Sequence, residues 1–110
     1  MTLLTDAPPA VVAPAPPTVG LEVTGPLDVT TLPRVRERIE QALADRPARL
    51  VVDLTACTFV DASALAVLLD AHRQLSRTGG VLTLRGSCPR VLRLLSLTGL
   101  RRVFDLDGAV

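Results

Sequence analysis

Two small oxygen-bearing side chains, Asp61 and Ser63, lie where the residue pattern changes from strand to helix. Residues 50–54 are almost entirely apolar, as expected for a buried strand, and an apolar helical pattern follows Ser63. The start of a helix presents free backbone N–H groups and a partial positive charge. Asp61 and Ser63 could therefore carry or recognise a phosphate there, or Asp61 could simply cap the helix.

The rest of the sequence does not support a catalytic use of Ser63. A serine nucleophile needs a base within hydrogen-bond reach, and His72 is the only histidine of the chain. Their separation along one helix places the two side chains about 13 Å apart. The surrounding residues do not match a nucleophile elbow, and no glycine-rich phosphate-binding loop occurs. We therefore predict that the chain is not an enzyme and has no catalytic residue.

Composition bounds the other classes of function. The chain has 110 residues, enough for one small domain, and a net charge of +1, so no electrostatic signature of nucleic-acid binding is present. Phe59 and Phe104 are the only aromatic residues, which predicts an aliphatic core. Cys57 and Cys88 lack the spacing of a zinc site, so no metal or cofactor is predicted. No signal peptide and no membrane-spanning run is recognised, and we predict a cytoplasmic protein without membrane insertion.

Strand and helix patterns alternate along most of the chain. Residues 1–18 are rich in proline and alanine and are predicted to form a disordered leader, followed by one domain over 19–110. The strands are predicted at 19–23, 50–54, 81–85 and 103–106, with a turn at Gly25-Pro26. The helices are predicted from Thr30 or Thr31 to about Arg46, from the Asp61 turn to Gly79-Gly80, and over 89–98 with Ser87 as cap. This alternation predicts an α/β fold with a mostly parallel sheet.

Four segments, in order, resemble the STAS domain of bacterial anti-sigma-factor antagonists. They are GPLD at 25–28, LVVDLT at 50–55, FVDASAL at 59–65, and the LL and TGL of the last helical segment, at 94–95 and 98–100. The resemblance covers about four-fifths of the chain. It implies a single small α/β domain, with a four- to five-stranded mixed, mostly parallel sheet and three to four helices packed on it.

The resemblance also implies a function. In that family, the serine directly after the aspartate is phosphorylated by a partner that is both a kinase and an anti-sigma factor. Here Ala62 occupies that position, Ser63 comes one residue later and points about 100° away on a helix, and Ala64 replaces a glycine. We therefore expect an antagonist that docks an anti-sigma factor of the serine-kinase type without the usual phosphorylation switch. Ser63 is the candidate substitute phosphorylation site, and the predicted contact residues are Asp28, Asp61, Ala62, Ser63 and Ala64.

Two questions stay open at this point. The alternative function within the family is a STAS subunit of a multiprotein scaffold or of a lipid-transport complex, also acting through protein contacts. The second question concerns a group of arginines near the C-terminus, which could form a solvated face or a partner-docking patch. They are Arg90, Arg93, Arg101 and Arg102.

Overall fold

The computed structural model describes residues 18–86 and 89–107 of the chain. The predicted leader up to residue 17 and the predicted helix cap Ser87, with Cys88, lie outside the described residues. The described elements are β2 (Thr18–Glu22), β3 (Gly25–Leu27), α1 (Leu32–Ala44), β4 (Arg49–Asp53), β5 (Cys57–Val60), α2 (Ala62–Arg77), β6 (Val81–Arg85), α3 (Pro89–Thr98) and β7 (Asp105–Asp107).

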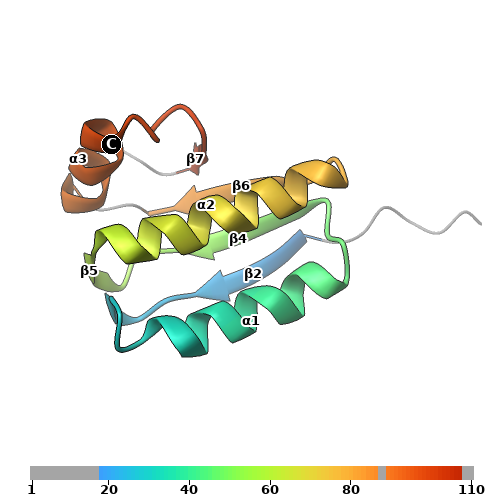
Figure 1. The fold of residues 1–110 in the computed structure, drawn as a ribbon, viewed down its shortest axis with the longest axis horizontal. Helices are drawn as coiled ribbons and strands as arrows, with labels where there is room; N and C mark the ends of the chain where they lie inside the picture. The colour runs from blue at the N-terminus through green and yellow to red at the C-terminus, as the bar shows by residue number, and fades with distance from the viewer. Residues whose placement is uncertain (1–17, 87–88, 108–110) are drawn as a thin grey trace, which may run out of the picture.

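The main sheet has four strands in the order β2-β4-β6-β7. Helices α1 and α2 lie side by side across one face of this sheet, and α3 lies beside β5 at the carboxyl ends of β4 and β6 (Figure 1). The predicted α/β class, with a mostly parallel sheet and three helices, is confirmed. The family resemblance implies a mixed, mostly parallel sheet, and every strand pair within the described residues is parallel.

The core lies between the sheet and helices α1 and α2. Alternate residues of the central strands point into it, which leaves Leu50, Val52 and Leu82 with no exposed surface. The core is aliphatic as predicted, except that Phe104 packs at its edge. The Phe104 ring lies edge-on to His72, with the ring centroids 5.9 Å apart, so His72 is a packed helix residue.

A short second pair of strands corrects the sequence prediction. The sequence predicts a turn at Gly25-Pro26 and no strand around Phe59, but these segments form β3 and β5, which pair in parallel as a separate two-stranded sheet. Gly25 has a positive φ of 75°, and its N–H donates to the carbonyl of Ala56. Strands of three and four residues are too short to show a two-residue alternation, so the sequence pattern does not reveal them.

The predicted element boundaries agree closely at most positions. Helix α1 begins after Thr31 and ends just before Arg46-Pro47, where the sequence predicts its end. The Thr31 hydroxyl does not cap this helix, however, but donates to the Pro26 carbonyl at 2.9 Å. Gly79, at a φ of 79°, follows α2 as predicted. The last strand, β7, begins at Asp105, two residues after its predicted start at 103.

Candidate docking site at the start of helix α2

The β3–β5 pair brings the two predicted aspartates together. Leu27 is paired with Val60 in the parallel register, so Asp28 and Asp61 follow at the same edge. The Asp61 N–H donates to the Leu27 carbonyl at 3.3 Å, which joins the two loops directly. The sequence places Asp28 and Asp61 thirty-three positions apart, and the fold makes them neighbours.

Asp61 is the N-cap of α2, as predicted. Its carboxylate accepts the Ala64 N–H at 2.9 Å and the Ser63 hydroxyl at 2.6 Å. The bond from the Ser63 hydroxyl and then that from the Ala64 N–H lower the pKa of Asp61, so the side chain stays ionised at neutral pH. The Ser63 hydroxyl is therefore already used as a donor, which orients its oxygen toward Asp61.

Asp28 is held in the same way by its own loop. Its carboxylate accepts the Thr30 hydroxyl at 2.6 Å and the Thr30 N–H at 2.9 Å, and these bonds lower its pKa. The charge of nearby Asp61 acts in the opposite direction, because two carboxylates repel. The result is a fixed surface with two ionised carboxylates at the amino end of α2.

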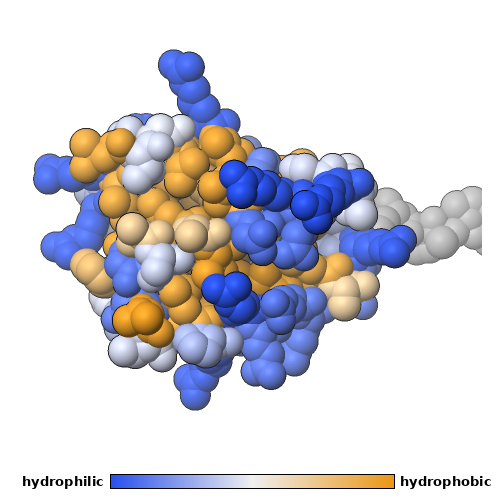
Figure 2. Space-filling model, viewed as in Figure 1, coloured by the Kyte–Doolittle hydropathy of each residue, from blue (hydrophilic) through white to orange (hydrophobic). Residues whose placement is uncertain are grey.

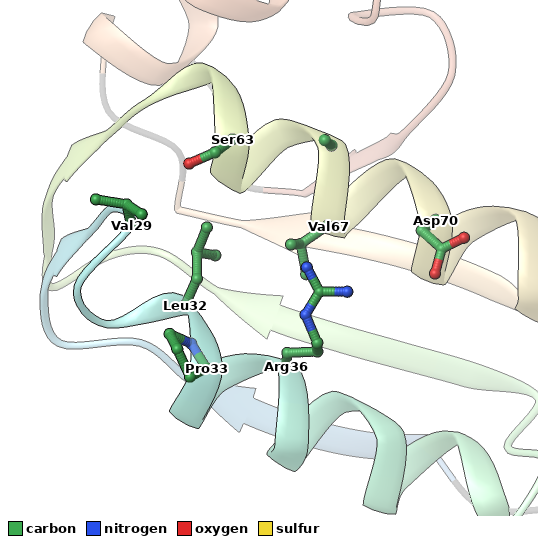
Figure 3. Close-up of a pocket in the computed structure, with 8 residues that line it drawn as sticks. Val29, Leu32, Pro33, Arg36, Ser63, Val67 and Asp70 are labelled. Atoms are coloured by element: carbon green, nitrogen blue, oxygen red, sulfur yellow. The ribbon is translucent and has the colours of Figure 1, made fainter.

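Two grooves flank the first turn of α2, one on each side. The first, here called the α1/α2 groove, runs between those two helices, with Ser63 at its head and Arg36 and Asp70 on its opposite walls. Figure 3 shows Val29 and Leu32 on the α1 side of this groove, across from Ser63 and Val67 of α2. Val29 is 69% exposed, which is unusual for a large aliphatic side chain.

The second groove, here called the α3 groove, lies between the start of α2 and helix α3. Its residues are mostly apolar with an arginine rim: Phe59, Val60, Asp61, Ala62, Arg90, Arg93, Leu94 and Leu97. Ala62 therefore lines one groove and Ser63 the other, as expected from the angle between successive helix residues. A hydroxyl at Ser63 does not occupy the place that a hydroxyl at Ala62 would.

The five predicted contact residues differ in their access to a partner. Asp28, Asp61, Ala62 and Ser63 lie at the surface. Ala64 has no exposed surface, so it supports this turn from within the core. Leu97, which is not among the predicted contact residues, is 77% exposed beside Ala62 in the α3 groove. Its signal was the outward stripe of Arg90, Leu94 and Leu97 at helical spacing, opposite the buried residues of α3.

The described part of the chain offers little for other kinds of site. No cluster of three or more potential metal-ligating side chains occurs within residues 18–86 and 89–107. In the same residues, no helix is both long and apolar enough to cross a bilayer.

Comparison with known proteins identifies the family. The family model described as the STAS domain matches residues 10–110, so the chain belongs to the STAS-domain family. The anti-sigma-B factor antagonist of Listeria monocytogenes is 30% identical over 82% of this chain and 79% of its own length. The anti-sigma-F factor antagonist RsfB of Mycobacterium tuberculosis is 33% identical over 78% of this chain and 70% of its own.

The fold agrees with the same family. A crystal structure of an anti-sigma factor antagonist from Mycobacterium paratuberculosis matches with a TM-score of 0.76 and 29% sequence identity. The match covers 84% of this chain and 79% of that one. Anti-sigma factor antagonists are non-enzymatic regulators, and the chain is a member of this family.

Proposed function

We propose that this chain is an antagonist that binds an anti-sigma factor of the serine-kinase type and thereby releases a sigma factor in the cytoplasm. The observation that carries the proposal is the rigid turn in which Asp28 and Asp61 lie together at the start of α2. Both carboxylates are ionised and their loops are fixed by hydrogen bonds, so a partner meets a surface that is already ordered. The similarity to proteins named as anti-sigma factor antagonists supports the proposal.

We also propose that the chain lacks a phosphorylation switch at the position of Ala62. A phosphate at this position would add about −1.5 to −2 charge beside two ionised carboxylates and would weaken docking by repulsion. Ala62 has no hydroxyl and cannot accept a phosphate. The chain therefore binds its partner whether or not ATP is present.

Ser63 is the one remaining acceptor that we propose within this turn. Its hydroxyl is exposed and hydrogen-bonded to Asp61, but it lines the α1/α2 groove. A phosphate there would lie on the other side of the turn from Ala62. Phosphorylation of Ser63, if a kinase performs it, would act on a different part of the surface.

The test is a binding and phosphate-transfer assay. The purified chain is mixed with a panel of purified serine-kinase anti-sigma factors, with and without ATP, and complex formation and radiolabelled phosphate transfer are measured. We expect a complex that ATP does not dissolve, and no phosphate on the unmodified chain. Ala62→Ser should gain phosphate and lose the complex in ATP, and Ser76→Ala, an exposed position far along α2, is the matched control.

Other outcomes would change the proposal. Phosphate transfer to the unmodified chain that Ser63→Ala abolishes would show that the switch has moved by one residue. A complete lack of binding across the panel would overturn the antagonist function and favour a scaffold or lipid-transport subunit.

A further inference from the structure

The α3 groove exposes several apolar side chains to water, which is unfavourable. Leu97 is 77% exposed and Phe59 is 37% exposed, and both border the same groove with Leu94. Figure 2 shows apolar side chains gathered over the end of the molecule that carries β5, α3 and the beginnings of α1 and α2. Such a patch with a polar rim is typical of a surface that binds a partner.

The rim of this groove is cationic. Arg90 lies over the Phe59 ring, with its guanidinium carbon 5.6 Å from the ring centroid, and Arg93 lies one helical turn further. Neither arginine forms an ion pair within the described residues. Asp61 borders the groove, but its carboxylate accepts bonds from Ser63 and Ala64 instead. The groove therefore has cationic donors that lack a carboxylate partner.

Ala62 completes the apolar wall. A serine here would add a hydroxyl to the wall that Phe59 and Leu97 also line, whereas the alanine side chain is a single methyl group. The nearest hydroxyl of the turn, on Ser63, faces the α1/α2 groove. The substitution that removes a phosphate acceptor also makes the α3 groove a better site for an apolar side chain.

We propose that the α3 groove is a peptide-docking site for an acidic, apolar segment of a partner protein. A leucine, methionine or phenylalanine of that segment packs between Phe59, Ala62 and Leu97. An aspartate or glutamate beside it pairs with Arg93 and Arg90, whose planar guanidinium groups suit a carboxylate. The proposal rests on the proposed function, because this groove adjoins the Asp61 turn and would determine which anti-sigma factor binds.

The experiment starts from peptides, because it then needs no knowledge of the partner. A displayed library of random twelve-residue peptides is selected against the full chain, and enriched peptides are synthesised and titrated. We expect enriched sequences to pair an acidic residue with a large apolar one, and amide shifts in the NMR spectrum to cluster at Phe59, Ala62 and α3. Arg93→Glu should weaken these peptides at least about tenfold. Arg102→Glu, an exposed arginine outside the groove, should leave them unchanged.

Several results would overturn the proposal. They are enrichment of peptides without acidic residues, shifts confined to the α1/α2 groove, no enrichment at all, or equal loss with Arg102→Glu. Binding of a single-stranded oligonucleotide at the same residues, with no peptide selected, would show that the arginines serve nucleic acid instead.

The anti-sigma factor assay separates this proposal from the function on which it rests. If a complex forms and Arg93→Glu leaves its affinity unchanged, the docking groove is wrong and the antagonist function stands. If no anti-sigma factor binds but acidic peptides still do, the groove is right and the function is wrong.

Discussion

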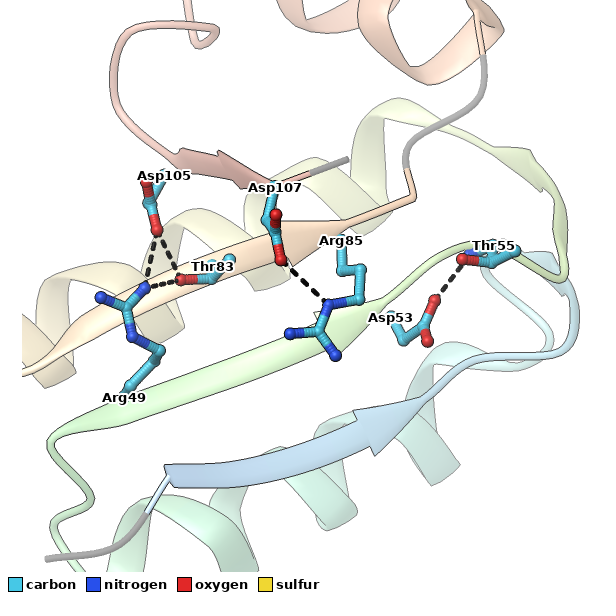
Figure 4. Close-up of polar contacts among 7 residues, drawn as sticks. All are labelled: Arg49, Asp53, Thr55, Thr83, Arg85, Asp105 and Asp107. Atoms are coloured by element: carbon cyan, nitrogen blue, oxygen red, sulfur yellow. Dashed lines mark hydrogen bonds and ion pairs between the residues drawn. The ribbon is translucent and has the colours of Figure 1, made fainter. Parts of the chain in front are cut away.

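Two regions of this domain arrange their charged residues in opposite ways. The first is the face of the main sheet that none of the described helices covers, here called the charged face. Figure 4 shows its network, in which Arg49 bonds to Thr83 and lies 2.7 Å from Asp105, while Arg85 lies 3.1 Å from Asp107. The second region is the α3 groove, where Arg90 and Arg93 border exposed apolar side chains and, among the described residues, have no ion-pair partner.

This difference indicates that the charges on the sheet stabilise the fold, whereas the arginines of the α3 groove are available to bind a partner. On the charged face, the Thr83 hydroxyl is buried and donates to Asp105, so the cluster completes its own hydrogen bonds. In the α3 groove, neither Arg90 nor Arg93 forms an ion pair with any residue of 18–86 or 89–107. Charges that are already paired give little to a new interface, whereas unpaired arginines beside apolar surface are typical of binding hot spots.

The largest expected effect comes from placing one negative charge in each of the two regions and comparing the losses in binding. Leu97→Asp, in the α3 groove, should weaken the complex with the anti-sigma factor by about 2 kcal/mol, roughly 30-fold, as expected for a hot-spot residue. Val81→Asp is the matched change on the charged face, where Val81 is 39% exposed, and should leave affinity unchanged. Isothermal titration calorimetry measures both. Equal losses would mean that the two faces do not differ in binding.

A second pair of substitutions compares stability instead of binding. Asp105→Ala leaves the buried Thr83 hydroxyl without its acceptor and removes the ion pair to Arg49. We expect the free energy of unfolding to fall by about 2 kcal/mol, mostly from the unsatisfied buried hydroxyl, since exposed ion pairs contribute little. Arg93→Ala, in the groove, should change it by less than about 0.5 kcal/mol.

Urea denaturation followed by circular dichroism gives both free energies. Thr83→Val is a useful control, because it removes the hydroxyl but leaves Arg49 and Asp105 paired. It should cost less than Asp105→Ala. A larger cost for Arg93→Ala than for Asp105→Ala would contradict the assignment of structural charges to the sheet.

The sequence predicts the central strand and helix of this fold better than the short strands that form the candidate site. Long apolar patterns, such as 50–54 and the helix after Asp61, are clear because burial fixes their periodicity. The Asp61 cap also follows from the residue type alone. Strands β3 and β5 are not predicted, since segments of three and four residues show too little alternation and their strand character depends on their pairing with each other.

The same limit applies to the site. The sequence predicts that Asp28 and Asp61 belong together through the resemblance, but their pairing depends on the long-range β3–β5 register. The α3 groove depends on contact between α3 and β5, which local patterns do not specify. Leu97 shares a helical stripe with Arg90 and Leu94, but only the packing of α3 shows that this stripe borders Phe59 and Ala62.

A third prediction uses pH to compare the same two regions. Hydrogen bonds from Thr83 and then Arg49 lower the pKa of Asp105, and those from Ser63 and Ala64 lower that of Asp61. The unfolded chain therefore takes up protons first as pH falls below about 5, so both groups contribute stability that is lost on acidification. Asp105→Asn and Asp61→Asn cannot titrate and should each flatten the decrease in melting temperature between about pH 5 and 3.

The two variants should differ at neutral pH. Asparagine caps a helix about as well as aspartate, so Asp61→Asn should keep the melting temperature of the unmodified chain at pH 7. Asp105→Asn loses the ion pair with Arg49 and should melt at a lower temperature. Thermal melts at a series of pH values measure both effects. An unchanged acid slope in either variant would refute the contribution of that carboxylate.

The smallest expected effect lies within the charged face itself. Both side chains of the Arg85–Asp107 pair are about half exposed, and no buried group depends on them, unlike the pair that Thr83 connects. Arg85→Ala should therefore reduce the free energy of unfolding by only about 0.2–1 kcal/mol, and 1 M salt, which shortens the Debye length to about 3 Å, should remove most of the difference. Urea titrations in low and high salt, with Arg77→Ala as an exposed arginine on α2 for control, measure this. If Arg85→Ala costs as much as Asp105→Ala, the exposed pair is structural in its own right, and the buried Thr83 hydroxyl is not what distinguishes the two pairs.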